Sequence, residues 1–249
     1  MARRKTGFYN TIEYVGPRPT KPKRQNFFGG WVIVALAVGL GFWFGRPLVT
    51  PLWGAEGVSQ EQAQVLSTSL DASGKPCQML AAAALRHSGE NVVYDPSYYR
   101  ISYPNGDIPH GKGAAADVVI RCLRQIDIDL QKEVHEDMVG NFRLYPDLWN
   151  AKEPDPNIDH RRIENLRRYF ERHAQVLSPS SDAVDYRPGD IVIWSLAKAE
   201  KHIGIVVPGP GKQMSELWVV HNMGAGVKWE NALFEYKIDA HFRCPADSK

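Results

Sequence analysis

The sequence lacks several features that would decide its class at once. No repeat or low-complexity tract stands out, and no HExxH or comparable spacing of metal ligands occurs. Cysteine is scarce, since the 249 residues hold only three, at positions 77, 122 and 244. The remaining composition is ordinary for a globular protein, and the length fits one good-sized domain plus an appendage.

Acidic residues are almost absent from the first 26 positions, where Glu13 stands against seven Lys and Arg. The rest of the chain holds 23 basic and 27 acidic residues, so basic character belongs to the tail (1–26) and not to the domain. This distribution removes the main electrostatic argument for nucleic-acid binding by the domain, and we expect no nucleic-acid partner.

Charge is missing altogether from the run Phe27–Gly45. As a helix this run spans roughly 28 Å, which matches the hydrocarbon thickness of a bilayer. The basic tail before it places residues 1–26 in the cytoplasm and the following residues outside. A cleaved signal peptide is the alternative, but the run is longer than a usual h-region and PLWGAEG offers no good cleavage site. We expect an uncleaved single-pass anchor in the inner (cytoplasmic) membrane, with an extracytoplasmic, periplasmic domain.

Residues 46–70 read as a stalk or linker, with two prolines followed by the polar stretch SQEQAQVLSTSL, and the folded domain is expected over 71–249. In an oxidising compartment the odd number of cysteines leaves at least one thiol unpaired. Cys122 lies at helical spacing from Val119, Leu123 and Ile126 and is expected in the core. Cys77 and Cys244 can pair, though only elimination favours this.

The apolar pattern of the domain changes from helical to alternating along the chain. We expect helices over 78–89, from Asp117 onward, over 133–146 and over 158–177, with a short strand at 91–95. Strands are expected over 190–196, 202–208, 217–222 and 232–243. Helices first and an antiparallel meander last is an α+β order, with N-terminal helices packed on a C-terminal sheet.

A nucleophile is missing from a place where one is typical. In HGKGAAADVVIRC (110–122) a glycine-flanked loop leads into a helix, and the start of a helix favours a thiolate and an oxyanion. Three alanines, Ala114 to Ala116, occupy that place.

Two histidines stand at the ends of neighbouring strands. His202 begins the strand HIGIV, and His221 ends the next strand and is followed by Asn222. Adjacent antiparallel strands can bring His202 near His221 or Asn222, the arrangement of a base with its orienting partner. The structural alternative is two strand-end histidines that bond to backbone carbonyls.

These segments carry a resemblance to a known superfamily. PGDIVIW, HIGIVV and VVHN resemble the C-terminal half of the NlpC and CHAP-type papain-like peptidoglycan hydrolases. Roughly residues 93 to 243 resemble the bacterial domain-of-unknown-function family 1287 more closely. The segments that carry this resemblance include YDPSYYRISYPNGDIP, VHEDM, PDPNIDHRR, HNMGAG and LFEYKI. The resemblance implies a papain-like domain without a cofactor.

The resemblance also implies a catalytic cysteine at the start of the central helix, His202 as its base, and His221, or more weakly Asn222, as the orienting residue. Aligned on Gly111, Gly113 and Asp117, the expected cysteine falls on Ala115. A natural loss and an introduced replacement both explain this alanine, and we favour natural loss.

Further polar residues are candidates for substrate binding: Tyr99, Asp117, His135, Glu136, Asp137, Asp159, His160 and Arg161. The alternative is structural, with helix-end clusters, an Arg161 ion pair and a tyrosine loop that covers the core. A metal site is the less favoured enzymatic option, and we assign none. We expect a membrane-anchored domain that binds a peptidoglycan stem peptide or a protein partner, and is inactive through Ala115. The alternatives are an active thiol hydrolase in disabled form and a structural subunit of a membrane complex.

Overall fold

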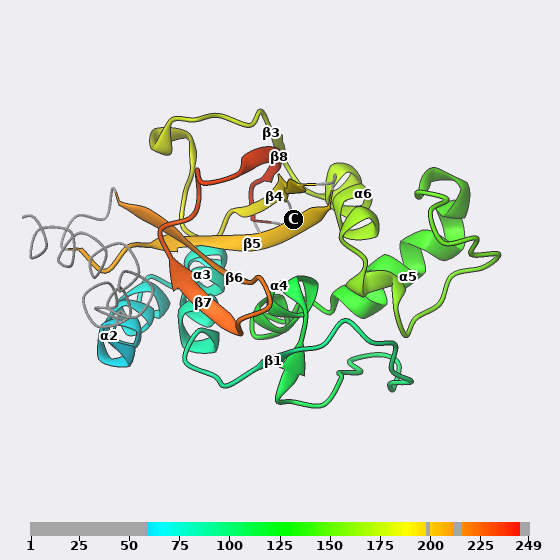
Figure 1. Cartoon of the computed structure of the whole chain (residues 1–249), viewed down its shortest axis with the longest axis horizontal. Helices are drawn as coiled ribbons and strands as arrows, with labels where there is room; N and C mark the ends of the chain where they lie inside the picture. The colour runs from blue at the N-terminus through cyan, green and yellow to red at the C-terminus, as the bar shows by residue number, and fades with distance from the viewer. Residues whose placement is uncertain (1–58, 198–199, 212–215, 245–249) are drawn as a thin grey trace, which may run out of the picture. The chain divides into compact units, whose positions relative to one another are not determined.

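The computed structural model describes residues 59–244, apart from 198–199 and 212–215. The basic tail 1–26 and the expected anchor Phe27–Gly45 lie outside the described residues. Among the helices that are described, none is long and apolar enough to cross a membrane. Helices come first in this part of the chain and a mainly antiparallel sheet comes later (Figure 1), which is the α+β order expected from the sequence.

The helical half consists of α2 to α6 and three short 3₁₀ turns. Helix α3 is almost wholly buried, and its alanines 81–84 have no exposed surface, so neighbouring elements can approach it closely. The bounds are α2 Gln60–Asp71, α3 Pro76–His87, α4 Ala115–Arg124, α5 Leu130–Asn141, η1 Phe142–Leu144, η2 Asp159–Arg161, α6 Ile163–His173 and η3 Ala183–Asp185.

Helix α2 corrects the expected domain boundary. Residues 60–70 were assigned to a linker because they are mostly polar, yet they form a helix capped by Ser59, whose hydroxyl accepts the N–H of Gln62. Ala63, Ser67 and Leu70 form its buried face, whereas Val65 is exposed. Residues 60–70 are therefore part of the folded domain and not of a linker.

The strands form a two-stranded parallel pair and a six-stranded sheet. Strands β1 (Val93–Tyr94) and β2 (Lys112–Gly113) make the pair, in which β2 leads directly into α4. The larger sheet has the order β3-β8-β4-β5-β6-β7. Its strands are β3 Val176–Leu177, β4 Ile191–Ser195, β5 Lys201–Pro208, β6 Leu217–Asn222, β7 Val227–Glu230 and β8 Lys237–Phe242.

This topology differs from the expected meander in two respects. Strand β7 lies in a segment read as part of a turn-rich connection, and the last strand, β8, returns to pair with β4 instead of continuing from β7. Strands β4 to β7 do form a meander, because neighbouring strands in this part of the sheet are consecutive in the chain.

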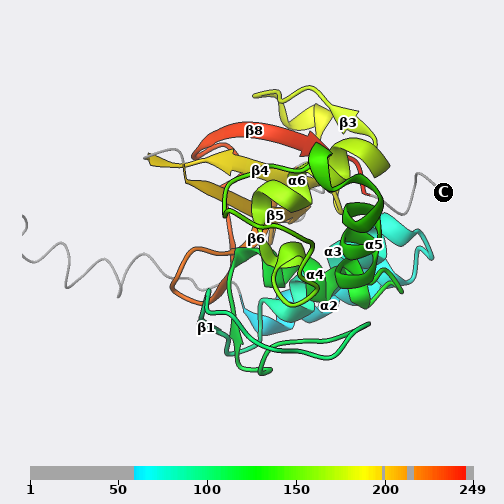
Figure 2. The same ribbon diagram turned by 90° about the vertical axis from the view of Figure 1, so that its right-hand side faces the viewer.

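The sheet is covered on both faces. Along β4, Ile191 and Ile193 join the core formed with the helices, whereas Val192 and Trp194 join a second core with Tyr186 and the segment 232–233. Successive side chains of a strand point to opposite faces, so this division follows from the alternation. Figure 2 shows α3 and α4 below the strands, on the side of the first core.

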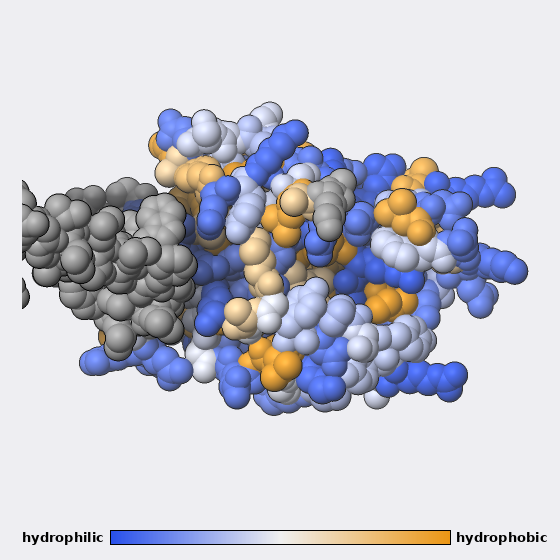
Figure 3. Space-filling model, in the orientation of Figure 1, coloured by the Kyte–Doolittle hydropathy of each residue, from blue (hydrophilic) through white to orange (hydrophobic). Residues whose placement is uncertain are grey.

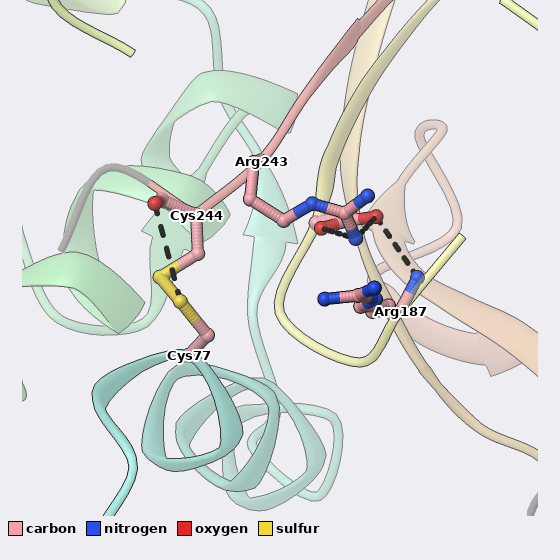
Figure 4. The surroundings of a disulfide bond; sticks show 5 residues. Cys77, Arg187, Arg243 and Cys244 are labelled. Carbon is pink, nitrogen blue, oxygen red and sulfur yellow. Dashed lines mark hydrogen bonds and ion pairs between the residues drawn. A yellow bond between two sulfur atoms is a disulfide. The ribbon is translucent and has the colours of Figure 1, made fainter. Parts of the chain in front are cut away.

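A disulfide joins the start of the helical half to the end of the sheet. Cys77 on α3 is bonded to Cys244, with 5.5 Å between the Cα atoms (Figure 4). Next to it, Arg243 donates to the buried Asp190 carboxylate. Cys122 is fully buried in the core, which confirms the role expected for it. Burial raises the pKa of the Cys122 thiol, so it cannot replace a reactive thiolate.

Candidate functional site

The central helix α4 begins at Ala115 because an acidic side chain closes its first turn. Ala114 offers no capping group, and the Asp117 carboxylate accepts the backbone N–H of Ala114 at 2.6 Å. An acid in the first turn also suits the positive end of the helix dipole. The helix was expected from Asp117 onward, and its observed start makes Ala115 the first helical residue.

Position 115 has the surroundings of an anion site but no reactive group. Ala115 is buried, and its methyl group can neither donate a proton nor attack a carbonyl. The first N–H groups of a helix have no acceptor within the helix, and the dipole adds positive potential there. A thiol at this place would have a lowered pKa, and an oxyanion would find donors.

A buried ion pair fixes the loop in front of α4. Arg161 donates from Nε to Asp117 Oδ1 at 2.8 Å and from Nη2 to Asp117 Oδ2 at 3.0 Å. Its Nη1 also donates to the Ser97 carbonyl at 2.6 Å, and both charged side chains are almost fully buried. Asp117 and Arg161 therefore neutralise each other in a structural ion pair, and their assignment to substrate binding stays a prediction.

Three strands bring a chain of polar side chains together. His202 on β5 and His221 on β6 lie with Nε2 and Nδ1 at 2.8 Å, and His221 Nε2 lies 2.8 Å from Glu230 Oε1 on β7. The three side chains lie diagonally across neighbouring strands on one face of the sheet, and we call them the relay. The expected contact of His202 with His221 is therefore present.

Trp194 packs against the relay. It pairs with His202 across strands β4 and β5, and the two rings stack with centroids 5.7 Å apart. Gly204, opposite His221 in the register, leaves room for the indole, because a Cβ at Gly204 would lie 3.0 Å from Trp194. Both histidines are buried, whereas the Glu230 side chain is half exposed. The relay thus runs from a buried imidazole to a solvated carboxylate.

The relay has one consistent direction of donation while both rings are uncharged. The hydrogen bond from His221 lowers the pKa of Glu230, so its carboxylate is an acceptor near neutral pH. His221 therefore donates from Nε2 and accepts at Nδ1, and His202 donates from Nε2. Burial and the neighbouring His221 lower the pKa of His202 to about 3. The lone pair of His202 Nδ1 then remains as an acceptor, with no hydrogen bond to any described residue.

Asn222 does not make the contact with His202 that would orient a catalytic base. Its side chain points to the opposite face from His221, donates to the Gly113 carbonyl at 3.1 Å, and accepts the Gly224 N–H at 3.0 Å. It has no hydrogen bond to His202, so of the two residues only His221 is hydrogen-bonded to His202. The contact with Gly113 also places the end of β6 against the loop that leads to Ala115.

Tyr99 lies in the same region as the start of α4. Its hydroxyl donates to Asp95 at 2.6 Å and accepts from Lys112 at 3.0 Å. The Arg161 guanidinium lies 6.0 Å from its ring centroid. Tyr99, Asp117 and Arg161 are therefore brought together around the loop before Ala115, and the half-buried tyrosine ring covers this network.

The remaining candidates lie along α5 and η2 and mostly serve structural contacts. Asp137 accepts from Arg172 at 2.8 and 2.9 Å, which ties α5 to α6. Asp159 is buried and accepts the Asp155 N–H at 2.6 Å. Both carboxylates thus have partners within the domain, and their assignment to substrate binding stays a prediction.

His135, Glu136 and His160 differ from these acids. Glu136 is exposed, and His135 is half buried, edge-on to Tyr103 with centroids 5.1 Å apart. His160 is buried, and burial lowers its pKa to about 4. None of the three bonds to the relay. No three His, Cys, Asp or Glu side chains in the described part of the chain form a group able to hold a metal ion.

Sequence reasoning missed Glu230. The signal was available in VKWE (227–230), where two apolar residues alternate with two charged ones after the turn NMGAG. That alternation is typical of a half-buried strand. Read as a strand antiparallel to LWVVHN, it places Glu230 on the face of His221.

Comparisons with known proteins identify relatives of this chain. A family model described as "Domain of unknown function (DUF1287)" matches residues 81–244. The "Uncharacterized protein YijF" of Escherichia coli (strain K12) is 45% identical over 164 residues, which are 66% of this chain and 80% of that protein.

Among solved structures, NlpC1 and NlpC2 from Trichomonas vaginalis match with TM-scores of 0.35 and 0.33. They are 15% and 14% identical over 66% of this chain, and the chain spans less than half of either, 43% and 45%. Similarity at this level says nothing about activity or substrate.

Proposed function

Because the chain belongs to the DUF1287 family, we propose from its site that it is a membrane-anchored domain of the cysteine amidohydrolase type. In this proposal it binds peptidoglycan stem peptide without cleaving it. The anchor is Phe27–Gly45, and the domain lies in the periplasm. The observation that carries the proposal is a complete His202–His221–Glu230 relay in a chain whose central helix begins with an alanine.

The relay supports hydrolysis of an amide by a thiol, for which this chain has the base but not the nucleophile. In a thiol form, a cysteine at position 115 gives its proton to His202 Nδ1 and its sulfur attacks the amide carbonyl carbon. Backbone N–H groups at the start of α4 hold the oxyanion. The C–N bond then breaks, the amine leaves with the proton from His202, and water hydrolyses the thioester.

With alanine at position 115 the first step of this sequence cannot take place. The neutral His202 Nδ1 remains an acceptor for a peptide N–H, and the helix start remains a donor for a carbonyl. Both groups are used for binding in this proposal. The intact relay also favours a second candidate, an active thiol hydrolase of which this chain is a disabled form.

The test compares the full chain with its Ala115→Cys variant, both purified in mild detergent. Each is incubated with purified sacculi and synthetic stem peptides, and soluble products are followed by mass spectrometry. We expect Ala115→Cys to release fragments and iodoacetamide to abolish this release. Adding His202→Ala should slow release by about 100-fold or more, the usual loss of a general base.

Ala114→Cys is the matched control, because it places a thiol one residue away from the proposed position. Release of fragments by the unchanged chain would contradict its inactivity. Equal activity of the two cysteine variants, or none in either, would contradict the assignment of position 115. The unchanged chain should sediment with sacculi, and a chain that stays in solution would contradict the binding function.

A further inference from the structure

A second hollow lies between α5, η1 and α6 and shares no lining residue with the relay. Its volume is about 280 Å³, slightly below the range usual for drug-sized ligands, so it suits one small ring or residue. Phe142, Tyr145 and Trp149 supply aromatic walls, and Met138 adds an apolar surface. We call this hollow the α5–α6 pocket.

The floor of the pocket contains a polar group without a partner. Asn165 is 1% exposed and lines the pocket. Its Nδ2 donates to the Asp159 carbonyl at 3.2 Å, which leaves Oδ1 with no hydrogen bond in the described part of the chain. A buried acceptor left unpaired is costly, so a ligand that donates an N–H or O–H here is favoured.

The rim of the pocket is polar but electrically balanced. Arg162 stacks over Trp149 with 4.2 Å from its guanidinium carbon to the ring centroid and donates to Asp159. Arg143 and Asp147 also line the pocket, and neither has an ion-pair partner among the described residues. Two cations and two carboxylates favour a neutral ligand that has both donors and acceptors.

Apolar side chains continue outside the pocket. Val139, Leu144 and Leu148 are all exposed next to it along the chain. In Figure 3, hydrophobic surface lies among charged residues over the end of the molecule that carries α5. An aromatic pocket with an apolar margin and a neutral polar rim suits a sugar ring, which presents C–H groups on its faces and hydroxyls at its edges.

We propose that the α5–α6 pocket binds one acylamino sugar unit, with its amide N–H donating to Asn165 Oδ1. The acyl methyl group packs on Met138 and Phe142, and the ring lies against Trp149. This site goes beyond the proposed function, since it uses different residues and a different chemical group from the peptide site. The same sugar unit can come from a soluble sugar or from a glycan strand.

The test is isothermal calorimetry of the full chain in detergent with N-acetylglucosamine, its tetramer and glucose. Both acetylated sugars should bind, and glucose should bind at least about tenfold more weakly, the loss expected for one hydrogen bond to a buried acceptor. Tighter binding of the tetramer than of the monomer points to glycan as the source, and equal binding points to a soluble sugar. No measurable binding of either acetylated sugar would overturn the proposal.

Two variants locate the site. Trp149→Ala should weaken binding about tenfold or more, and Phe234→Ala, an exposed aromatic outside the pocket, should not; their exposures are 37% and 44%. Asn165→Leu should remove the preference for N-acetylglucosamine over glucose. If Asn165→Leu unfolds, the Trp149→Ala result decides alone. Equal binding by Trp149→Ala and Phe234→Ala would place the sugar elsewhere and overturn the proposal. Because cleavage of stem peptide is measured separately with Ala115→Cys, the two proposals fail independently.

Discussion

His202, His160 and His241 are all buried, yet each has different neighbours. His241 Nε2 lies 2.8 Å from Asp190, whereas His160 Nδ1 is buried with no partner among the described residues. His202 alone begins a series of hydrogen bonds that ends at a half-exposed carboxylate. Of the three, only His202 is linked through a second histidine to a solvated carboxylate while its own Nδ1 stays available, and this combination makes His202 the candidate base.

Glu230 should fix the tautomers of both relay histidines. In Glu230→Ala, His221 loses the group that accepts its Nε2–H. The preference of His221 for the Nε2–H tautomer should therefore fall, and the same preference of His202 should fall as a result. Long-range ¹H–¹⁵N correlation spectra measure the tautomer of each ring directly. Lys228→Ala, an exposed residue on the same strand and face, should change neither ring. Unchanged tautomers in Glu230→Ala would contradict the relay.

At the scale of elements, the position of α4 depends on charge buried around its first turn. Asp117 closes the turn, and Arg161 on η2 binds both its carboxylate oxygens and the carbonyls of Ser97 and Asp95. Arg161 therefore joins the first turn of α4 to the segment 95–97, and Asp117 joins Arg161 to the backbone N–H of Ala114. The contacts observed for Asp117 and Arg161 position the first turn of α4.

Arg161→Met should destabilise the domain by about 3–5 kcal/mol, because it leaves the Asp117 carboxylate buried without its counter-ion. Thermal or urea unfolding measures this loss. Arg168→Met is the matched control on α6, where Arg168 forms an exposed ion pair with Glu171. Its cost should be below about 1 kcal/mol. Equal losses in the two variants would mean that the buried pair does not hold this turn.

At the scale of the whole molecule, the buried histidines should make the fold sensitive to mild acid. Burial lowers the pKa of His202 to about 3 and that of His160 to about 4, below the ordinary value near 6.5. Between about pH 6.5 and 4 the unfolded chain therefore binds more protons than the folded one. Stability should be fully present above pH 6.5 and decline as the pH falls through this window.

Unfolding by urea at pH 7.5, 5.5 and 4.5 tests this decline. We expect His160→Gln to reduce the slope of the free energy of unfolding against pH. The reduction should be up to about 1.4 kcal/mol per pH unit, which is the contribution of one titrating group. His110→Gln, at an exposed position, should leave the slope unchanged. A stability that stays constant from pH 7.5 to 4.5 in the unchanged chain would contradict neutral burial of both histidines.

Local pattern by itself determined much of this protein. The period of apolar residues indicated helices and then strands, and the spacing of Cys122 placed it in the core. The positions of His202 and His221 at the ends of neighbouring strands predicted that the two side chains lie close together. The same pattern pointed to Ala114 to Ala116 at the start of a helix, and the family resemblance narrowed these three positions to Ala115.

Only the tertiary structure decided the rest, because those features join residues distant in sequence. The polar composition of α2 indicated a linker and not a buried helix. The order of the strands, with β8 beside β4, cannot be predicted from local periodicity. The bond of Cys77 to Cys244 spans 167 residues. Whether His221 or Asn222 bonds to His202 depended on which face of β6 carries each side chain. The pairing of Arg161 with Asp117 depended on how η2 packs against α4. Each of these features depends on packing between residues that are far apart in the chain. Burial and charge pairing stabilise that packing, and a short stretch of sequence does not reveal it.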